Sequence, residues 1–267
     1  TDIELVGTDL YLASNNRGLR LLDTTTGTLQ QLPTGIHNFQ DGLKVVGDEL
    51  FIGLQGSGTS SAGIQVFNTS TNTYTAGRLL AGLPSNNVNS FLTVTETDNS
   101  GQISSEMVYV ATNNGVARWN ATGDKLETAW TALDGLPISF VEDIVEFDGD
   151  IWMATPNGIS HYDTTAMSIT NYDKSDGLMG TSTWGLVGAT TTSTDSSGVT
   201  TTQNSLFISH DGRGTDRPGI TQFDAGSQTV IDLHQFDQSP SNSVSAVTAD
   251  IWGVHIATDT GPLIHWI

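Results

Sequence analysis

One block of residues recurs along the chain, and such an internal repeat constrains the architecture more than any other sequence feature. The block is a short apolar strand ending in a small residue, a loop, a Gly, a second apolar strand and then Asp or Asn. Its clearest copies are DLYLASNNRGLRLLD (9–23), MVYVATNNGVARWN (107–120) and DIWMATPNGISHYD (150–163). Two copies have longer loops (49–68 and 205–224), and a sixth, less regular copy covers 253–267.

The spacing from the Gly to the Asp or Asn is five residues in each of the first five copies, although the preceding loops differ greatly in length. The pairs are Gly18 and Asp23, Gly63 and Asn68, Gly115 and Asn120, Gly158 and Asp163, and Gly219 and Asp224. Chance would not preserve this spacing, so we interpret the repeat as a structural unit.

The flanking sequence completes four strands per unit. An apolar strand and a tight Gly- or Asp-containing turn precede several blocks, as in 3–6, 43–46 and 144–147. A Thr/Asn/Gly-rich turn and a fourth short strand follow each of the first five. Four antiparallel strands at a period of about 40–55 residues, without helical periodicity, predict an all-β fold, a β-propeller of four-stranded blades. A β-sandwich, the alternative, should not repeat its sequence at that length.

The repeat predicts six blades in a single domain spanning 1–267. The expected limits are 3–34, 42–82, 87–134, 140–174, 182–234 and 244–267. The sixth blade has three recognisable strands and is expected to be incomplete. Either the ring closes on a thin last blade, or the parent chain continues past Ile267, in which case seven blades are the alternative.

The charge balance excludes two classes of partner. The chain has 9 basic and 29 acidic side chains, a formal charge of −20, yet charged residues make up only 14% of it. An average soluble protein has about 25%, so the acidity reflects few cations more than many carboxylates. Because no Lys or Arg cluster is available for phosphates or anionic headgroups, we expect no nucleic-acid partner and no binding to anionic lipid.

The chain has no cysteine, which excludes disulfides, thiolate metal sites and Cys nucleophiles. No apolar run approaches the ~18 residues of a membrane span, so we expect no membrane insertion. The sequence opens at Thr1 without Met or a signal peptide, which we interpret as a mature or excised piece of something longer, so other domains of a parent chain are possible partners. Its Ser/Thr-rich, Lys-poor, acidic composition favours an extracellular, periplasmic or cell-surface location.

The segments between blocks complete a family pattern. They read QDGLK (40–44), AGLPSNNV (81–88), DGLPISFV (134–141) and SDGLMG (175–180). With the WMATPNGISHYD-type block, the chain resembles the two-component-regulator propeller repeat of periplasmic sensor domains, closely over 134–163, well over 82–120 and more loosely elsewhere. The resemblance implies a propeller and, by analogy only, a sensor role.

The residues that carry this resemblance are structural. The small residue after the second strand is expected to allow close packing near the axis, and the Gly to supply a positive φ or a close approach. The aromatic residue before the Asp or Asn is expected to fill space between blades. The sequence carries no kinase or DNA-binding module.

A ligand site is expected on the face formed by the loops between second and third strands and by the blade-joining loops, because loops on a rigid scaffold carry function. The segment HDGRGTDRPG (210–219) has the most polar chemistry there. Its Asp and Arg residues can clasp a polar or carboxylate-bearing ligand, or simply pair with each other. The candidate ligand-binding residues are Arg17, Asn114, Asn157, Trp184, His210, Asp211, Arg213, Arg217 and Asp259.

The opposite face is expected to carry two long inserts, TETDNSGQISSE (95–106) and TTTSTDSSGVTTTQNS (190–205). Both read as protruding Thr-rich hairpins, either contact arms or exposed decoration. Their Asp residues lack the carboxylate ladder of a calcium loop, so we predict no metal.

No catalytic or cofactor motif is present. The six histidines show no paired ligand spacing, and there is no GxSxG elbow, P-loop or dinucleotide fingerprint, so we predict no cofactor. His161, His255 and His265 are expected to be buried core residues, as are Trp119, Trp152 and Trp266. The sequons at Asn68 and Asn120 coincide with the turn position of the repeat, so turn chemistry explains them with or without a glycan.

Three functions remain open from the sequence. The first is a non-catalytic recognition or sensor-like propeller that binds a ligand, glycan or protein through one face. The second is a structural or adhesive module of a large surface protein or assembly. The third is a propeller lyase or hydrolase, with His210, Asp211 and Asp259 at its channel mouth.

Overall fold

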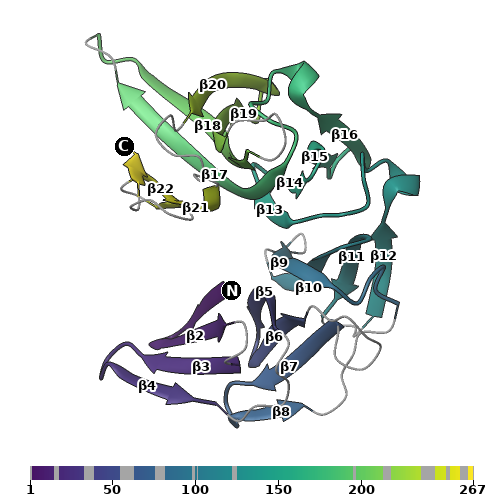
Figure 1. Ribbon diagram of the computed structural model, residues 1–267, viewed down its shortest axis with the longest axis vertical. Helices are drawn as coiled ribbons and strands as arrows, with labels where there is room; N and C mark the ends of the chain where they lie inside the picture. The colour runs from purple at the N-terminus through teal and green to yellow at the C-terminus, as the bar shows by residue number, and fades with distance from the viewer. Residues whose placement is uncertain are drawn as a thin grey trace. The chain divides into compact units, whose positions relative to one another are not determined.

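The computed structural model divides into two compact units, Thr1–Thr131 and Ala132–Ile267 (Figure 1). That all six sheets form one domain therefore stays a prediction. The residues that the structure describes are 2–14, 18–32, 39–54, 63–75, 82–97, 100, 102–121, 125–194, 197–212, 218–235, 244–250, 253–258 and 264–266.

The first unit contains three four-stranded antiparallel sheets, each with its strands in chain order. Its strands are β1 (Asp2–Val6), β2 (Asp9–Ser14), β3 (Gly18–Asp23), β4 (Thr28–Gln31), β5 (Phe39–Val46), β6 (Glu49–Leu54), β7 (Gly63–Asn68), β8 (Thr73–Thr75), β9 (Val88–Thr97), β10 (Ile103–Thr112), β11 (Gly115–Asn120) and β12 (Lys125–Trp130).

The second unit repeats this plan with two four-stranded sheets and, within the described residues, a three-stranded one. Its strands are β13 (Asp143–Phe147), β14 (Asp150–Thr155), β15 (Gly158–Asp163), β16 (Ser168–Tyr172), β17 (Thr183–Thr194), β18 (Thr200–Asp211), β19 (Pro218–Asp224), β20 (Thr229–Gln235), β21 (Val244–Asp250), β22 (Gly253–Thr258) and β23 (Ile264–Trp266). Two short 3-10 helices, η1 (Ala132–Asp134) and η2 (Lys174–Asp176), join sheets.

In the first five sheets the repeat motif coincides with the third strand. Four of these five strands begin at the motif Gly, and all five end at the Asp or Asn. That last residue accepts backbone hydrogen bonds from the turn that follows, as Asp163 Oδ1 does from the amides of Thr165 (2.8 Å) and Ala166 (2.7 Å). Asn68 Oδ1 accepts in the same way from Thr71 N at 2.8 Å. Turn chemistry therefore explains the Asn68 sequon, and its glycosylation stays a prediction.

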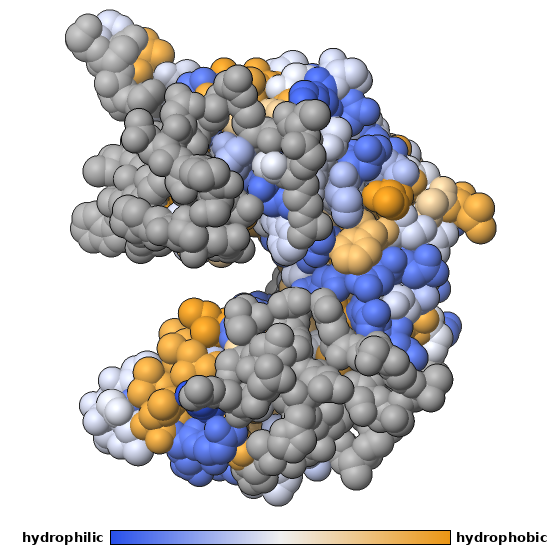
Figure 2. Space-filling model, in the orientation of Figure 1, coloured by the Kyte–Doolittle hydropathy of each residue, from blue (hydrophilic) through white to orange (hydrophobic). Residues whose placement is uncertain are grey.

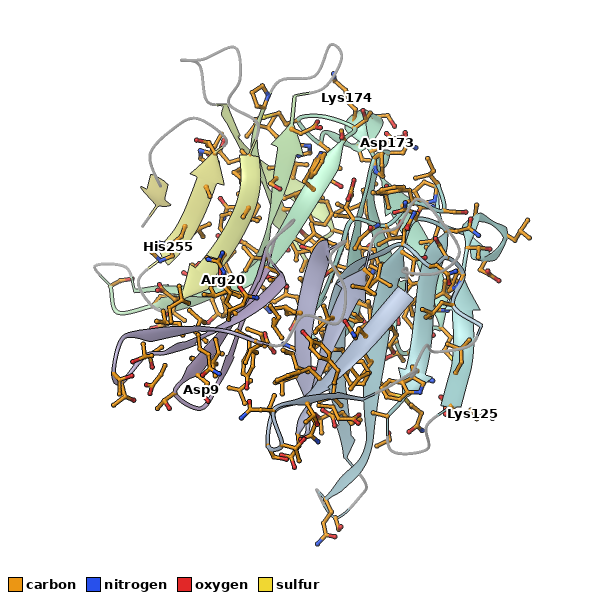
Figure 3. The ribbon with its side chains drawn as sticks, turned by 60° about the horizontal axis from the view of Figure 1, so that its bottom comes forward. Asp9, Arg20, Lys125, Asp173, Lys174 and His255 are labelled. Atoms are coloured by element: carbon orange, nitrogen blue, oxygen red, sulfur yellow. The ribbon has the colours of Figure 1, made fainter. Side chains whose placement is uncertain are left out.

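The blade-joining DGL segments also have a defined role. In the second unit, Asp173 caps η2 in a capping box, Gly177 ends it with a φ of 103°, and Leu178 is buried. Figure 3 labels Asp173 and Lys174 where β16 leads into this turn. The segment around Gly135 and Leu136 repeats the arrangement, with a φ of 111° and a buried Leu.

The core lies between neighbouring sheets of a unit. The aromatic residue before the Asp or Asn fills this space in three sheets, as expected, and each of the three side chains is buried: Phe67, Trp119 and Phe223. The small residue of the second strand allows the sheets to approach. A Cβ at Gly53 would lie 2.9 Å from Val88 Cγ1 and 3.3 Å from Phe91 of the next sheet.

The first strands of successive sheets within a unit lie beside one another, β1 by β5 by β9, and β13 by β17 by β21. Four-stranded antiparallel sheets packed face to face along such first strands are the blades of a β-propeller. Each unit therefore has the predicted all-β fold of propeller-type blades, with three four-stranded sheets in the first unit and, among the described residues, two four-stranded sheets and one three-stranded sheet in the second.

The two predicted Thr-rich hairpins are present in the structure. In the first, β9 pairs with β10 as far as Thr97 and Ile103, and in the second, β17 pairs with β18 as far as Thr194 and Thr200. Figure 2 shows apolar side chains gathered over the first sheet, where Ile3 and Leu5 of β1 are more than half exposed.

Candidate recognition site

The turn between β14 and β15 is held by a buried threonine. The Thr155 hydroxyl donates to the carbonyl oxygen of Gly158 (2.9 Å) and accepts from the amide of Asn157 (3.1 Å), which leaves the Asn157 side chain exposed. The sequence A-T-x-N-G encodes this turn, because the Gly has a φ of 99°. The turn between β10 and β11 has the same geometry, with Thr112, Asn114 and Gly115 in the same places.

The start of β17, in the neighbouring sheet, binds this turn. The Thr183 hydroxyl donates to the carbonyl oxygen of Thr155 (2.8 Å) or of Gly158 (2.9 Å) and accepts from the amide of Thr155 (2.9 Å). The amide of Gly158 also donates to the carbonyl of Thr181, at 2.6 Å. Because Thr155 and Thr183 are fully buried, these hydrogen bonds are protected from water and fix the exposed turn to the next strand.

A β-bulge follows immediately in β17. Thr183 pairs with His210 and Leu186 with Ile208, so Trp184 and Gly185 together face one residue of β18. Trp184 is half-buried, with its indole nitrogen inside. Bulges of this kind commonly re-aim a side chain near a functional site.

Two buried polar side chains, His210 and Thr221, contact each other in the sheet that carries the bulge. The ring of His210 is fully buried, and its Nε2 lies 2.8 Å from Thr221 Oγ1, which also accepts from the amide of Met179 at 3.1 Å. Asp211 is 7% exposed and pairs with Pro218 in the ladder. His210 therefore stabilises the pairing of β18 with β19 through its contact with Thr221 and, in this structure, does not face the surface.

The structure brings four of the predicted site residues together. Asn157, Trp184, His210 and Asp211 lie on segments joined by the Thr155 and Thr183 hydrogen bonds. Asn114 belongs to the first unit, where its Nδ2 donates to the carbonyl of Pro84 at 3.2 Å. The other predicted residues lie outside the described part of the chain and stay predictions: Arg17, Arg213, Arg217 and Asp259.

A second buried histidine is structural. His161 is 3% exposed, stacks on Trp152 with ring centroids 4.2 Å apart, and lies 2.8 Å from Asp150 Oδ2. Partial burial raises the pKa of Asp150, but hydrogen bonds from Thr164 and His161 together outweigh burial and hold that pKa below its ordinary value. The prediction of a buried core histidine is confirmed for His161 and wrong for His255, whose side chain is 24% exposed, and the buried Trp119 and Trp152 are confirmed.

Two further observations bear on chemistry. Among the described residues, no group of three or more His, Asp or Glu side chains is placed to hold a metal ion. In the same part of the chain, no helix is long and apolar enough to cross a membrane.

Comparison with solved structures places this fold beside several proteins. The extracellular domain of a proposed hybrid two-component system, BT4673 of B. thetaiotaomicron, superposes with a TM-score of 0.66 at 17% identity, covering 99% of this chain and 32% of that one. The computationally designed Ika8 protein matches at 0.57 and 12% identity over 98% of this chain and 81% of its own. Dihydro-heme d1 dehydrogenase NirN matches at 0.58 and 10% identity, over 98% and 51%.

These matches agree with the resemblance to regulator-type sensor propellers but share the fold alone at such identities. One is a sensor ectodomain, one a design and one an enzyme, so the fold does not decide the function. The chain spans about a third of the length of the sensor domain that it matches. No protein-family model matches the chain, and no curated protein matches it in sequence.

Sequence reasoning missed three residues that organise the site. Thr183 ties the two sheets together. At the bulge, Ser209 Oγ accepts from the amide of Gly185, and Asp143 Oδ2 accepts from the amide of Leu186. A signal for Asp143 existed, because D-I-x-x opens the first strand of two sheets, at Asp2 and at Asp143. Nothing in the sequence pairs either Asp with a backbone amide 41 or 43 residues away.

Proposed function

We propose that this chain is an extracytoplasmic, non-catalytic recognition propeller of the sensor type, which binds a small polar ligand or glycan at Asn157 and Trp184. The observation that carries the proposal is the buried Thr155–Thr183 linkage, which holds an exposed amide and a half-buried indole on neighbouring sheets. A binding site profits from such rigidity, because a preorganised site spends less free energy on ordering side chains.

The chemistry of these groups favours an uncharged ligand. The exposed Asn157 amide donates and accepts hydrogen bonds, and the Trp184 indole, whose nitrogen is buried, offers part of a flat apolar face. That combination suits the hydroxyls and apolar ring faces of a carbohydrate. A net charge of −20 disfavours anionic ligands unless Arg213 and Arg217, which the sequence predicts for the ligand-binding face and which belong to the same unit as Trp184, neutralise them locally.

The proposed location rests on composition and on the neighbours. The sequence is Lys-poor, Thr-rich and free of cysteine, and the sensor-type neighbour is an extracellular domain. Because the chain spans about a third of that domain, we propose that it belongs to the ligand-binding region of a larger surface protein.

The enzymatic alternative gains little support from the site. A general base must reach the proton that it abstracts, and the His210 ring is fully buried against Thr221.

The structural alternative is favoured by one observation, the exposed β17–β18 hairpin beyond Thr190. As a contact arm, this hairpin would bind a partner at the end of the sheet away from Asn157.

A binding screen tests the proposal. A panel of neutral, acidic and basic oligosaccharides is screened by thermal shift, and hits are titrated by calorimetry against wild type, Trp184→Ala, Asn157→Ala and Thr192→Ala. We expect a neutral glycan to bind, and at least a tenfold loss of affinity in the first two variants, since a buried aromatic anchor contributes about 2 kcal/mol or more. Thr192→Ala, on the exposed hairpin, is the matched control. Binding that survives both site variants, or that Thr192→Ala removes, would overturn the proposal.

A further inference from the structure

The bulge in β17 is held by two side chains that the repeat does not require. A bulge frees backbone groups from the ladder, and buried groups of this kind need other partners. The amide of Gly185 donates to Ser209 Oγ (2.8 Å), and the Ser209 hydroxyl donates back to the carbonyl of Gly185 (3.2 Å). The amide of Leu186 donates to Asp143 Oδ2 of the neighbouring sheet at 2.9 Å.

Ser209 departs from the repeat at the position where a hydroxyl is useful. The equivalent small residue is Gly53 in the second sheet and Ala in the four others, namely Ala13, Ala111, Ala154 and Ala257. Ser209 is fully buried, and its Oγ lies 3.3 Å from where a Gly185 Cβ would be. A buried hydroxyl is unfavourable unless hydrogen-bonded, so its presence here fits the two bonds it makes to the bulge.

Asp143 has a counterpart that provides a control. Asp2 pairs with Ala13 as Asp143 pairs with Ala154, and its Oδ2 accepts from the amide of Leu43 at 2.7 Å. Leu43 follows an irregularity at the start of β5, as Leu186 follows the bulge in β17. A hydrogen bond from a first-strand amide to an Asp of the preceding sheet therefore occurs in both units. At the bulge beside Trp184 it is combined with a hydrogen bond to a serine.

We infer that Ser209 and Asp143 are positioning residues that set the bulge of β17 and thereby the orientation of Trp184 in the binding face. This inference rests on the proposed function for its biological meaning, but its structural content concerns Trp184 alone. Ser209 binds the backbone of Gly185 within the bulge, and Asp143 binds the amide of Leu186, the first regularly paired residue after it. Gly185 therefore cannot return to regular pairing, and Leu186 cannot move away from the neighbouring sheet, without breaking one of these bonds.

The test needs no ligand. The full chain is labelled with 5-fluorotryptophan, the Trp184 resonance is assigned with Trp184→Phe, and spectra are recorded for Ser209→Ala, Asp143→Ala, Asp143→Asn and Asp2→Ala. Amide hydrogen exchange at 185 and 186 is measured in parallel. Ser209→Ala inserts the residue that four other sheets use there, so the fold accepts it.

We expect Ser209→Ala and Asp143→Ala to shift the Trp184 resonance and to speed amide exchange at 185 and 186 at least tenfold. Asp143→Asn, which keeps an acceptor oxygen, should restore the wild-type signal, and Asp2→Ala should leave it unchanged. An unmoved resonance in both Ser209→Ala and Asp143→Ala, or an equal shift in Asp2→Ala, would overturn the inference. Because no ligand is used, failure of the glycan screen would not affect this result.

Discussion

Glycines at the starts of third strands lie against carbonyl oxygens of fourth strands. A Cβ at Gly158 would overlap the carbonyl of Tyr172, and one at Gly115 or Gly219 would overlap Trp130 or His234 in the same way. Close approach therefore requires the Gly at all three positions, and a positive φ adds to this at Gly115 and Gly158. This explains why the Gly persists through loops of such different length.

Replacing Gly158 separates these two causes. Gly158→Ala should lower the free energy of unfolding by about 3 kcal/mol or more, because strain at a φ of 99° adds to a clash with backbone. Gly149→Ala is the matched control, since its φ is 86° but nothing lies within 4 Å of the new Cβ, and about 1 kcal/mol of strain is expected. Urea denaturation measures both. Equal losses would show that the Tyr172 carbonyl is unimportant.

Met167 offers the opposite change. It has a φ of 53° at the turn position where the first sheet has Gly27, and its side chain is exposed. Met167→Gly should raise the free energy of unfolding by about 0.5–1 kcal/mol, because the left-handed conformation costs a residue with a Cβ about that much more than it costs Gly. Gly27→Met should cost a similar amount, measured in the same denaturation experiment. A destabilised Met167→Gly variant would contradict this reading of the turn.

Between elements, one hydroxyl joins a turn to the strand of the next sheet. Thr183→Val removes a donor and an acceptor from Thr155 without changing volume, and should cost about 1–3 kcal/mol, the range for an unsatisfied buried group. Amide exchange at Thr155 should rise together with this loss. Thr192→Val, on the exposed hairpin, should be neutral within about 0.5 kcal/mol. A neutral Thr183→Val would mean that the turn holds its position without the neighbouring sheet.

A feature of the fold or of the site could be predicted from the sequence when the residues that determine it lie close together along the chain. The third strand Gly158–Asp163 was predictable because the Gly and the Asp act within one hairpin. The bulge at Trp184 was not, because it depends on Ser209 across the ladder and on Asp143 in another sheet. His210 was predicted as a loop residue at the face, whereas β18 extends through Asp211 and buries its ring. No residue type in the sequence marks the end of β18 at Asp211, whereas the Gly and the Asp of the repeat mark both ends of a third strand.

Across the whole molecule, part of the net charge of −20 comes from Asp carboxylates that accept hydrogen bonds in turns. Hydrogen bonds from the backbone of Thr26 lower the pKa of Asp23, and those from the backbone of Ser227 lower the pKa of Asp224. Hydrogen bonds from Ser175 do the same for Asp173. These carboxylates are acceptors that hold the chain reversals between strands or sheets, so the acidity follows from the repeat.

Acid should therefore weaken the fold. A carboxyl whose pKa is lower in the folded state stabilises fully above its unfolded pKa of about 3.9, and that contribution is lost as pH falls through the folded value. The free energy of unfolding should thus fall as pH drops below about 4. Asp224→Asn keeps an acceptor, as Asn68 does naturally, and should flatten this dependence. Denaturation at pH 6, 4 and 3 measures the difference, and identical slopes would contradict the assignment.

The central claim is that a ligand binds at the face carrying Asn157 and Trp184. Hydroxyl-radical footprinting with and without a glycan from the screen tests it most directly, because Trp184 and the exposed Met167 oxidise readily and lie in the same unit. We predict that bound glycan lowers the oxidation of Trp184 severalfold and leaves Met167 unchanged. Protection at Met167 or on the β17–β18 hairpin, with Trp184 oxidised as in the free protein, would contradict the account.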